Sequence, residues 1–275
     1  MRTVTTNFGP TPYLLALAAG LLLMGAWTDG RTQDSADANC LPSQVSPISG
    51  NELSGALEIL SWNIEKAGNP GWDSDLALLA NGINLAFIQE ASLQAEIPGS
   101  IPSPLHPTFA AGYLAGDKQT GVMTLSSTRP SRHCNFSHLE PWLGTPKAST
   151  VTEYPLAGRD DRLLTINLHA VNFAMGLAGY EQQLRSLMEL LAHHRGPAIL
   201  AGDLNTWSEG RQKLVDALME EHGLNPLTFQ PDLRTTAFGR ALDHIYVRGL
   251  KASFTEVIEV SSSDHNALRA SLEIN

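Results

Sequence analysis

The sequence A-I-L-A-G-D-L-N-T at residues 198–206 carries a carboxylate and an amide directly after a short apolar run. Brief apolar runs that are bounded by turn residues are typical of buried strands. Asp203 and Asn205 lie two positions apart, and in an extended segment such side chains point to the same side. The pattern predicts a strand that delivers both oxygen-bearing groups to one edge of a sheet.

Similar polar motifs stand at the ends of other predicted strands. They are W-N-I-E-K at residues 62–66, F-I-Q-E at 87–90, N-L-H-A-V-N at 167–172, L-D-H-I at 242–245 and S-D-H-N at 263–266. Strands are predicted at 57–62, 85–88, 121–125, 163–168, 198–201, 242–247 and 267–274. Apolar periodicity predicts helices at 180–194 and 212–222, and four prolines predict an irregular loop at 97–107. In a layered α/β protein, functional groups gather on loops at strand ends, where these motifs fall.

The motifs together contain the ligand types of a hard divalent cation. Mg²⁺ prefers carboxylate and amide oxygens and keeps several waters, and such oxygens come from Asn63, Glu90, Asp203, Asn205 and Asp264. Each motif alone has a plainer explanation, because a glutamate after a strand is usually a solvated cap and Asp-x-Asn usually forms a turn. Their occurrence together, each at a strand boundary, favours one common site.

The ordered series W-N-x-x-K, I-Q-E, N-L-H-A-x-N, G-D-L-N-T, L-D-H-I and S-D-H-N resembles the endonuclease/exonuclease/phosphatase superfamily. The likeness extends from about Leu57 to Ile274, and G-D-L-N-T and S-D-H-N are its most specific parts. That superfamily includes pancreatic-type deoxyribonucleases, abasic-site endonucleases, bacterial sphingomyelinases and inositol-polyphosphate phosphatases. The resemblance implies an α/β (α+β) fold, a four-layer sandwich of two mostly antiparallel β-sheets packed face to face with helices outside.

The resemblance also implies a role for each matched residue. The implied metal ligands are Asn63, Glu90, Asp264 and Asp203, and the expected cofactor is Mg²⁺, with Mn²⁺ or Ca²⁺ as alternatives. The implied catalytic residues are His265, its acidic partner Asp243, Asp203, His169 and Asn205, and the implied phosphate contacts are Asn172, Asn205 and His169.

These residue types predict in-line attack of water on phosphorus, a reaction whose barrier is mostly electrostatic. The cation would polarise a phosphoryl oxygen and stabilise the leaving oxyanion. His265, oriented by Asp243, would accept the proton of the water, and Asp203 is the alternative base. The phosphate contacts would donate hydrogen bonds to the transition state, each worth roughly 3 kcal/mol.

Four further residues have weaker signals. Lys66, Lys147 and Arg129 are candidate phosphate contacts, although a solvated side chain is the default expectation for each. His244 follows Asp243 directly and should point to the opposite face of its strand, so we interpret it as structural.

The formal net charge of −10, from 28 acidic and 18 basic residues, gives no long-range attraction to a polyanion. There is also no basic run with interleaved aromatic residues of the kind that duplex-reading proteins carry. An enzyme that meets phosphate through a bound cation is compatible with this charge, because the cation supplies the missing positive charge.

Three functions are consistent with these observations. The first is a metal-dependent nuclease or general phosphodiesterase, and the second is a phosphatase or phospholipase acting on lipid headgroups or small phosphoesters. A non-catalytic binding protein with the same fold is least favoured, because every expected catalytic residue type is present. The resemblance places His169 where abasic-site enzymes carry a tyrosine, which disfavours a role in DNA repair. About forty residues separate Asp203 from Asp243, which leaves little room for large recognition insertions. No obligate protein partner is indicated.

The N-terminal part of the chain has a different character. Residues 13–27 contain no charged side chain and are shorter than the roughly 20 residues that cross a bilayer, which fits the apolar core of a secretory signal. A buried core helix is disfavoured because the run has no polar face. We expect a signal peptide or membrane anchor at 1–28, a linker at 29–56 and the catalytic domain at 57–275. This organisation predicts a periplasmic or secreted protein, anchored to the inner membrane by the N-terminus where the signal is not cleaved.

The chain contains two cysteines, Cys40 and Cys134. In an oxidising compartment they would pair and tie the linker to the domain, and the alternative is two unrelated free thiols.

Overall fold

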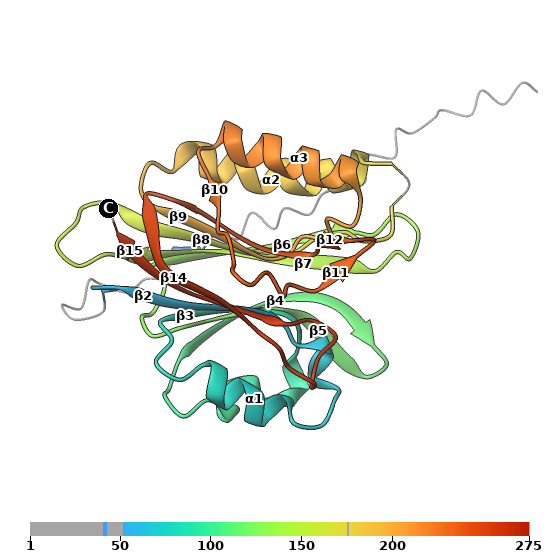
Figure 1. The fold of residues 1–275 in the computed structure, drawn as a ribbon, viewed down its shortest axis with the longest axis horizontal. Helices are drawn as coiled ribbons and strands as arrows, with labels where there is room; N and C mark the ends of the chain where they lie inside the picture. Colours follow the sequence, from blue (N-terminus) through green and yellow to red (C-terminus); the bar gives the residue numbers. More distant parts are fainter. Residues whose placement is uncertain (1–40, 43–51, 175, 275) are drawn as a thin grey trace, which may run out of the picture. The chain divides into compact units, whose positions relative to one another are not determined.

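The computed structural model describes residues 41–42, 52–174 and 176–274, and two β-sheets packed face to face form its centre (Figure 1). The first sheet has the order β1-β6-β7-β8-β9-β13-β10. Its strands are β1 (Leu41–Pro42), β6 (Arg132–Leu139), β7 (Pro146–Pro155), β8 (Arg162–His169), β9 (Ala198–Asp203), β13 (Asp243–Arg248) and β10 (Asn225–Pro226). Strands β8 and β9 are parallel, and the other neighbours are antiparallel.

The second sheet has the order β14-β15-β2-β3-β5-β4. Its strands are β14 (Leu250–Ile258), β15 (Ala267–Ile274), β2 (Leu57–Asn63), β3 (Leu85–Ser92), β5 (Lys118–Ser126) and β4 (His106–Ala115). Here β2 and β3 are the parallel pair. A separate small hairpin consists of β11 (Thr236–Ala237) and β12 (Arg240–Ala241).

Helices cover the outer face of each sheet. Figure 1 shows α2 (Ala178–His193) and α3 (Glu209–Glu221) over the first sheet and α1 (Trp72–Leu79) over the second. Short 3-10 turns occur at η1 (Glu65–Ala67), η2 (Leu93–Ala95) and η3 (Ile97–Ser100). One apolar cluster lies under α2 and α3, a second lies between the sheets, and a third lies under α1. The predicted four-layer sandwich of mostly antiparallel sheets is therefore confirmed.

The sequence analysis located the buried strands better than the other elements. All seven predicted strands and both predicted helices are present, with ends that differ by a few residues. Strands β4, β6, β7 and β14 and helix α1 were not predicted, and the predicted loop at 97–107 contains η3 and the start of β4. Among the described residues no helix is long and apolar enough to cross a membrane.

The domain begins before the predicted boundary at Leu57. Leu53 is buried, its backbone N–H donates to the carbonyl of Pro155 at 2.9 Å, and its carbonyl accepts from Ala157 at the same distance. The final residues of the predicted linker are thus part of the sandwich. The predicted signal or anchor at 1–28 and most of the linker lie outside the described residues.

Strand register brings the predicted motifs to one end of the sandwich. His169 is opposite Asp203 in the β8–β9 pair, and Asp203 is opposite Asp243 in the β9–β13 pair. In the second sheet, Asn63 at the end of β2 is opposite Gln89 in β3. We call this the site end: β2, β3, β8 and β9 finish there, and β13 and β15 begin there.

Candidate active site

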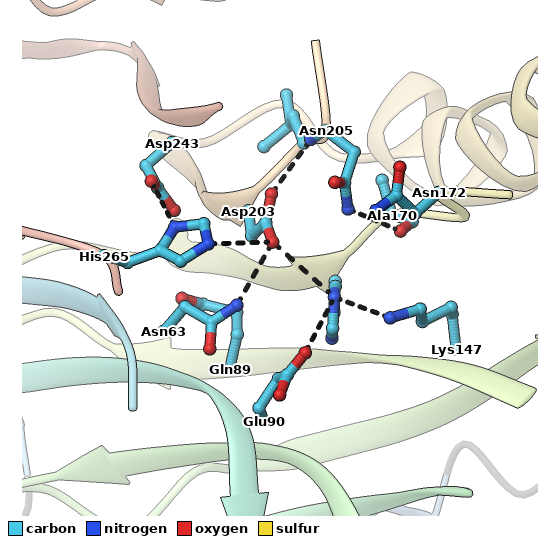
Figure 2. Close-up of polar contacts among 12 residues, drawn as sticks. Asn63, Gln89, Glu90, Lys147, Ala170, Asn172, Asp203, Asn205, Asp243 and His265 are labelled. Carbon is cyan, nitrogen blue, oxygen red and sulfur yellow. Dashed lines mark hydrogen bonds and ion pairs between the residues drawn. The ribbon is translucent and has the colours of Figure 1, made fainter. Parts of the chain in front are cut away.

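A cavity of about 440 Å³ opens at the site end. The predicted site residues that line it are Asn63, Glu90, His169, Asn172, Asp203, Asn205, Asp264 and His265. Asp243 does not reach the cavity surface and instead contacts His265 from behind. Motifs that are spread over two hundred positions of sequence therefore meet in one place (Figure 2).

Asp203, Asp243 and His265 form the buried polar centre of the site. His265 Nδ1 lies 2.7 Å from Asp243 Oδ2, and His265 Nε2 lies 3.9 Å from Asp203 Oδ2 (Figure 2). The backbone of His265 is fixed as well, since its N–H donates to Ser263 Oγ at 3.1 Å and its carbonyl accepts from Trp62 Nε1 at 2.9 Å. With one ring nitrogen held by Asp243, the other is directed toward Asp203.

The protonation of this centre is unusual for its residue types. Burial, followed by repulsion from Asp243, raises the pKa of Asp203 to about 7. Burial opposes charging of His265, yet the attraction of Asp243 and Asp203 outweighs it and raises the pKa of His265 to about 10. Near neutral pH, His265 is therefore the positively charged member, and Asp203 is close to its own titration point.

Asn63 and Glu90 face this centre from the second sheet. Asn63 Nδ2 donates to Asp203 Oδ2 at 3.1 Å, which links β2 to β9. Glu90 lies within a register irregularity between β3 and β5 and has a φ of 49°, a left-handed conformation that is uncommon outside glycine. Glu90 Oε1 lies 3.8 Å from His169 Nε2, and Glu90 Oε2 forms an ion pair with Lys66.

Lys147 is a site residue whose importance was not recognised from sequence. It is 7% exposed, and its Nζ lies 2.9 Å from His169 Nε2. Because an ammonium group can only donate, His169 Nε2 accepts this bond and the neutral ring carries its proton on Nδ1. Burial, and then the charge of Lys147, hold the pKa of His169 well below its usual value.

The expectation of a solvated side chain was therefore wrong for Lys147, which is a buried cation in the cavity wall. Lys66 also lines the cavity. Arg129 lies in the β5–β6 connection, at the opposite end of the sheets.

Asn205 and Asn172 present amides from the loops that follow β9 and β8. The backbone N–H of Asn205 donates to Asp203 Oδ1 at 3.0 Å, and Asn205 Nδ2 donates to the carbonyl of Ala170 at 3.0 Å (Figure 2). Asn172 Oδ1 accepts from Trp207 Nε1 at 2.9 Å. Since that bond occupies the amide oxygen, the donor end of Asn172 is directed away from Trp207.

Arg211 holds these two loops together from beneath. The side chain is buried, its Nη1 donates to the carbonyls of Val171 and Asn205 at 2.8 and 3.1 Å, and its Nη2 donates to the carbonyl of Asn172 at 2.7 Å. The guanidinium lies 4.6 Å from the ring centroid of Trp207. A single guanidinium thus satisfies three carbonyls of the loops that carry the site amides.

Glu140 supports the β8–α2 loop from the other side. It is 1% exposed, and its Oε1 accepts from the backbone N–H groups of Asn172 and Phe173 at 2.8 and 3.2 Å. Its Oε2 accepts from Thr145 Oγ1 at 2.8 Å, so the same carboxylate also ties down the β6–β7 loop.

Asp264 and His244 occupy different surroundings. Asp264 lines the cavity at its exposed edge, with Oδ1 4.0 Å from His265 Nε2, and its N–H donates to Glu65 Oε2 at 3.2 Å. Glu65 is therefore an additional carboxylate of the site that the sequence analysis did not single out. His244 is buried, contacts Thr206 and Arg234, and has its pKa lowered by burial to about 4. It does not line the cavity, as expected for the structural residue that we predicted.

The donor chemistry of the cavity fits a hard divalent cation. Five carboxylates and several side-chain amides face one volume, and their oxygens are the ligands that Mg²⁺ takes. Burial, and then repulsion from Asp243, raise the pKa of Asp203, so a bound cation would stabilise its carboxylate form. The nearest ammonium on the Glu90 side belongs to Lys66.

The fold and the site together are those of the endonuclease/exonuclease/phosphatase superfamily, whose members are generally phosphoester hydrolases. Residues 60–265 match the Endonuclease/Exonuclease/phosphatase family, and the chain belongs to this family. A UPF0294 protein of Vibrio vulnificus is 40% identical over 222 residues, which cover 80% of this chain and 78% of that protein.

Two solved structures illustrate the range of activities that share this fold. A mannosyl-6-phosphatase from Bacteroides thetaiotaomicron matches with a TM-score of 0.59 and 16% identity, covering 79% of this chain and 100% of the other. The endonuclease domain of TRAS1, a telomere-specific non-LTR retrotransposon, matches with a TM-score of 0.55 and 17% identity, covering 80% and 99%. At such identities the likeness shows the fold alone, so the substrate must be argued from the site.

Proposed function

We propose that the protein is a Mg²⁺-dependent phosphodiester hydrolase that works by in-line attack of water on phosphorus. One observation carries the proposal: Asp203, with a pKa near neutrality, faces the same cavity as a charged imidazole, a buried ammonium and a set of hard oxygen donors. This combination supplies a base for water and positive charge for a phosphoryl group.

Asn63, Glu90, Asp264 and Asp203 would hold the cation, with Mn²⁺ or Ca²⁺ as alternatives. When bound, the cation would neutralise phosphoryl oxygens and stabilise the leaving oxyanion. Glu65 is a further candidate ligand beside Asp264, because its Oε2 accepts a hydrogen bond from the backbone N–H of Asp264.

Asp203 is our proposed base, and His265 our proposed donor. A base is most effective when its pKa lies near the working pH, which fits about 7 for Asp203. Asp203 Oδ1 and Oδ2 each accept one N–H bond in the protein, and a carboxylate has lone pairs left for a water. His265, kept protonated by Asp243, would donate from Nε2 to a phosphoryl oxygen.

Lys147, Asn172 and Asn205 would bind the remaining phosphoryl oxygens. Because His169 Nε2 accepts from Lys147, we assign the donor role on this side to the ammonium, and His169 becomes the residue that orients it. The Trp207 contact leaves the amide nitrogen of Asn172 as the group available to the substrate.

We also propose that the reaction takes place outside the cytoplasm. Two features support this: the apolar run at 13–27, and the disulfide formed by Cys134, since disulfides persist in oxidising compartments.

The test is hydrolysis of bis(4-nitrophenyl) phosphate, plasmid DNA and phospholipid vesicles by the full chain with Mg²⁺. We expect turnover of the bis-aryl phosphate, loss of turnover in EDTA, and a fall in kcat/KM of about a thousandfold for Asp203→Ala and for His265→Ala. The matched controls are Asp216→Ala and His193→Ala, which are exposed and far from the cavity and should keep full activity.

A pH profile separates the two base assignments. If Asp203 is the base, kcat/KM of the wild type rises with pH as Asp203 loses its proton, at a pKa of about 7 in the metal-free protein and lower once the cation is bound, and it falls at higher pH as His265 loses its proton. Near-full turnover by either alanine variant would contradict the role assignments, and metal binding without turnover of any substrate would favour a binding protein.

A further inference from the structure

We infer that the loops around the cavity form a docking surface for a zwitterionic phospholipid bilayer. The inference rests on the proposed function, because it places the phosphoester that is hydrolysed at the surface of that bilayer. The evidence is the distribution of apolar and charged side chains over the two ends of the sandwich.

Large apolar side chains stand exposed around the mouth of the cavity. We call them the apolar rim: Leu114, Leu139, Trp142, Leu143, Phe173 and Phe238. Phe238 is 90% exposed, Leu114 is 66% exposed and Trp142 is 64% exposed. The rim residues lie in, or in the strand ends beside, four connections at the site end: β4–β5, β6–β7, β8–α2 and β11–β12. Leu143 and Phe173 also line the cavity itself.

This distribution is not that of an ordinary protein surface. Within the described residues, every strongly exposed large apolar side chain except Leu78 and Phe254 lies at the site end. The connections at the opposite end, residues 127–131, 156–161 and 194–197, expose none and carry several arginines and aspartates instead. Single exposed apolar residues are normal, whereas a group around one opening marks an interaction site.

One wall of the cavity also lacks exposed charge. Residues 139–146 contain a single charged side chain, that of Glu140. This side chain is buried under the β8–α2 loop. Residues 170–177 contain no charged side chain. A nucleic-acid strand gains its affinity from cations that contact successive phosphates. This wall offers apolar groups at the place where such cations would be needed, so it fits the apolar neighbour of a phosphoester.

A lipid surface matches both parts of the site. The buried ammonium of Lys147 and the amides lie at the cavity floor, where a phosphate would bind, and the rim lies at the mouth, where acyl chains would begin. Tryptophan is favoured at membrane interfaces because its ring is amphipathic. The formal net charge of −10 disfavours an anionic membrane, which is why we commit to zwitterionic lipid. In sequence, the apolar run at 13–27 ends 26 residues before Leu53, a length that keeps the domain within reach of a membrane.

The first experiment asks whether the rim enters the bilayer. Full-chain protein and its Trp142→Phe variant are mixed with phosphatidylcholine vesicles whose acyl chains carry bromine, which quenches nearby tryptophan fluorescence. The difference between the two proteins isolates the emission of Trp142, whatever the other tryptophans do. We expect this difference signal to be quenched by brominated vesicles, and to shift to shorter wavelength without quenching in ordinary phosphatidylcholine vesicles.

The second experiment removes apolar contact at two positions that do not line the cavity. We expect Trp142→Asp with Leu114→Asp to weaken vesicle binding about tenfold or more, as expected for two large side chains that no longer leave water. Hydrolysis of soluble bis(4-nitrophenyl) phosphate should stay within about twofold of wild type, because neither residue contacts the reacting groups. Leu78→Asp with Phe254→Asp is the matched control, since both positions are exposed but outside the rim, and it should bind vesicles as wild type does.

The outcomes separate the inference from the proposed function. Quenching of Trp142 without hydrolysis of any phosphodiester would leave the docking surface standing and remove the proposed reaction. Hydrolysis of the soluble diester without Trp142 quenching would overturn the docking surface alone. A tenfold loss of single-stranded DNA binding in the rim variant would identify nucleic acid as the occupant. A change from dimer to monomer by light scattering would identify a second copy of the chain, and either result would overturn the lipid assignment.

Discussion

At the level of single residues, the central feature is a pair of buried carboxyl groups so close together that they oppose each other's ionisation. Asp203 and Asp243 come from neighbouring strands in direct register, and His265 is placed against both. Their pKa values follow from that proximity: the pKa of Asp203 is raised toward 7, and the pKa of His265 is raised toward 10. The residue types were predictable from the D-L-N, L-D-H and S-D-H-N motifs. Their mutual electrostatics were not, because they depend on strand register and on the depth of burial.

The raised pKa values make a testable statement about stability. The folded protein binds protons at Asp203 and His265 more tightly than the unfolded chain does. Proton binding at each residue therefore contributes to the free energy of unfolding. The contribution of Asp203 is complete below about pH 4 and is lost as the pH rises through 7. The contribution of His265 is complete below about pH 6 and is lost as the pH rises through 10. We therefore expect the free energy of unfolding of the metal-free protein to fall steadily from pH 5 to pH 9. Urea unfolding in EDTA measures it.

The same argument fixes what Asp203→Asn should do. The amide keeps the shape but removes the ionisation that burial and Asp243 oppose, so we expect a gain of about 1 to 3 kcal/mol at pH 8 and a flatter pH dependence, together with loss of activity. Asp117→Asn, in the exposed β4–β5 turn, is the matched control. It should change neither the free energy of unfolding and its pH dependence nor the activity. An unchanged pH slope in Asp203→Asn would show that this carboxyl does not carry the shift.

Lys147 shows where prediction from sequence ends. It stands at the start of β7, in the sequence P-K-A-S-T-V-T-E-Y-P, which has too few apolar residues to indicate a buried strand. The strand is buried because small hydroxyl residues satisfy one another, as in the 2.6 Å contact between Thr152 Oγ1 and Thr165 Oγ1. With the strand missed, nothing in sequence placed the lysine beside His169. To place Lys147 beside His169, one would have had to predict that β7 pairs as a hairpin with β8, the strand that carries the N-L-H motif.

At the level of elements, the loops that carry the site amides depend on the start of α3. Ser208 caps this helix by accepting from the backbone N–H of Arg211 at 3.3 Å, which sets the direction from which Arg211 reaches back beneath the loops. A Ser-x-x-Arg start gives an ordinary helix signal in sequence. The guanidinium's three carbonyl partners lie up to forty residues earlier in the chain, so its role could be seen only in the fold.

We expect Arg211→Leu to lower the free energy of unfolding by about 3 kcal/mol or more, because it leaves three buried carbonyls without a donor. Activity should fall as well, since Asn172 and Asn205 lose their backbone support. Arg185→Leu is the matched control: Arg185 is half exposed and makes only an i,i+4 pair with Glu181, so its removal should cost less than about 0.5 kcal/mol. Urea unfolding and turnover of bis(4-nitrophenyl) phosphate measure both variants, and equal losses of stability would refute the structural role of Arg211.

At the level of the whole molecule, the site is assembled from both sheets and exists only when they are packed together. Asn63 Nδ2 bonds Asp203 across the two sheets, and below it Gln89 Nε2 donates to Asn167 Oδ1 at 2.8 Å. Asn167 Nδ2 in turn donates to the carbonyl of Met123 at 3.0 Å. The family resemblance predicted the sandwich from short motifs. It could not show these inter-sheet bonds, because their partners are 44 to 140 residues apart in sequence.

The last prediction concerns the disulfide of Cys134, in strand β6 near the edge of the first sheet. Cys134 is disulfide-bonded, and β1 pairs with β6 so that Leu41 is opposite His133. Cys40, the chain's other cysteine, lies outside the described residues, but this register makes it the expected partner. Full-chain protein purified from an oxidising compartment should therefore show no thiol that reacts with a chromogenic disulfide reagent in denaturant, and Cys40→Ser should expose one. Reduction should lower the free energy of unfolding by about 2 to 4 kcal/mol without abolishing hydrolysis of the soluble diester, because the bond is remote from the cavity. Two reactive thiols in the untreated protein would establish the alternative of free cysteines.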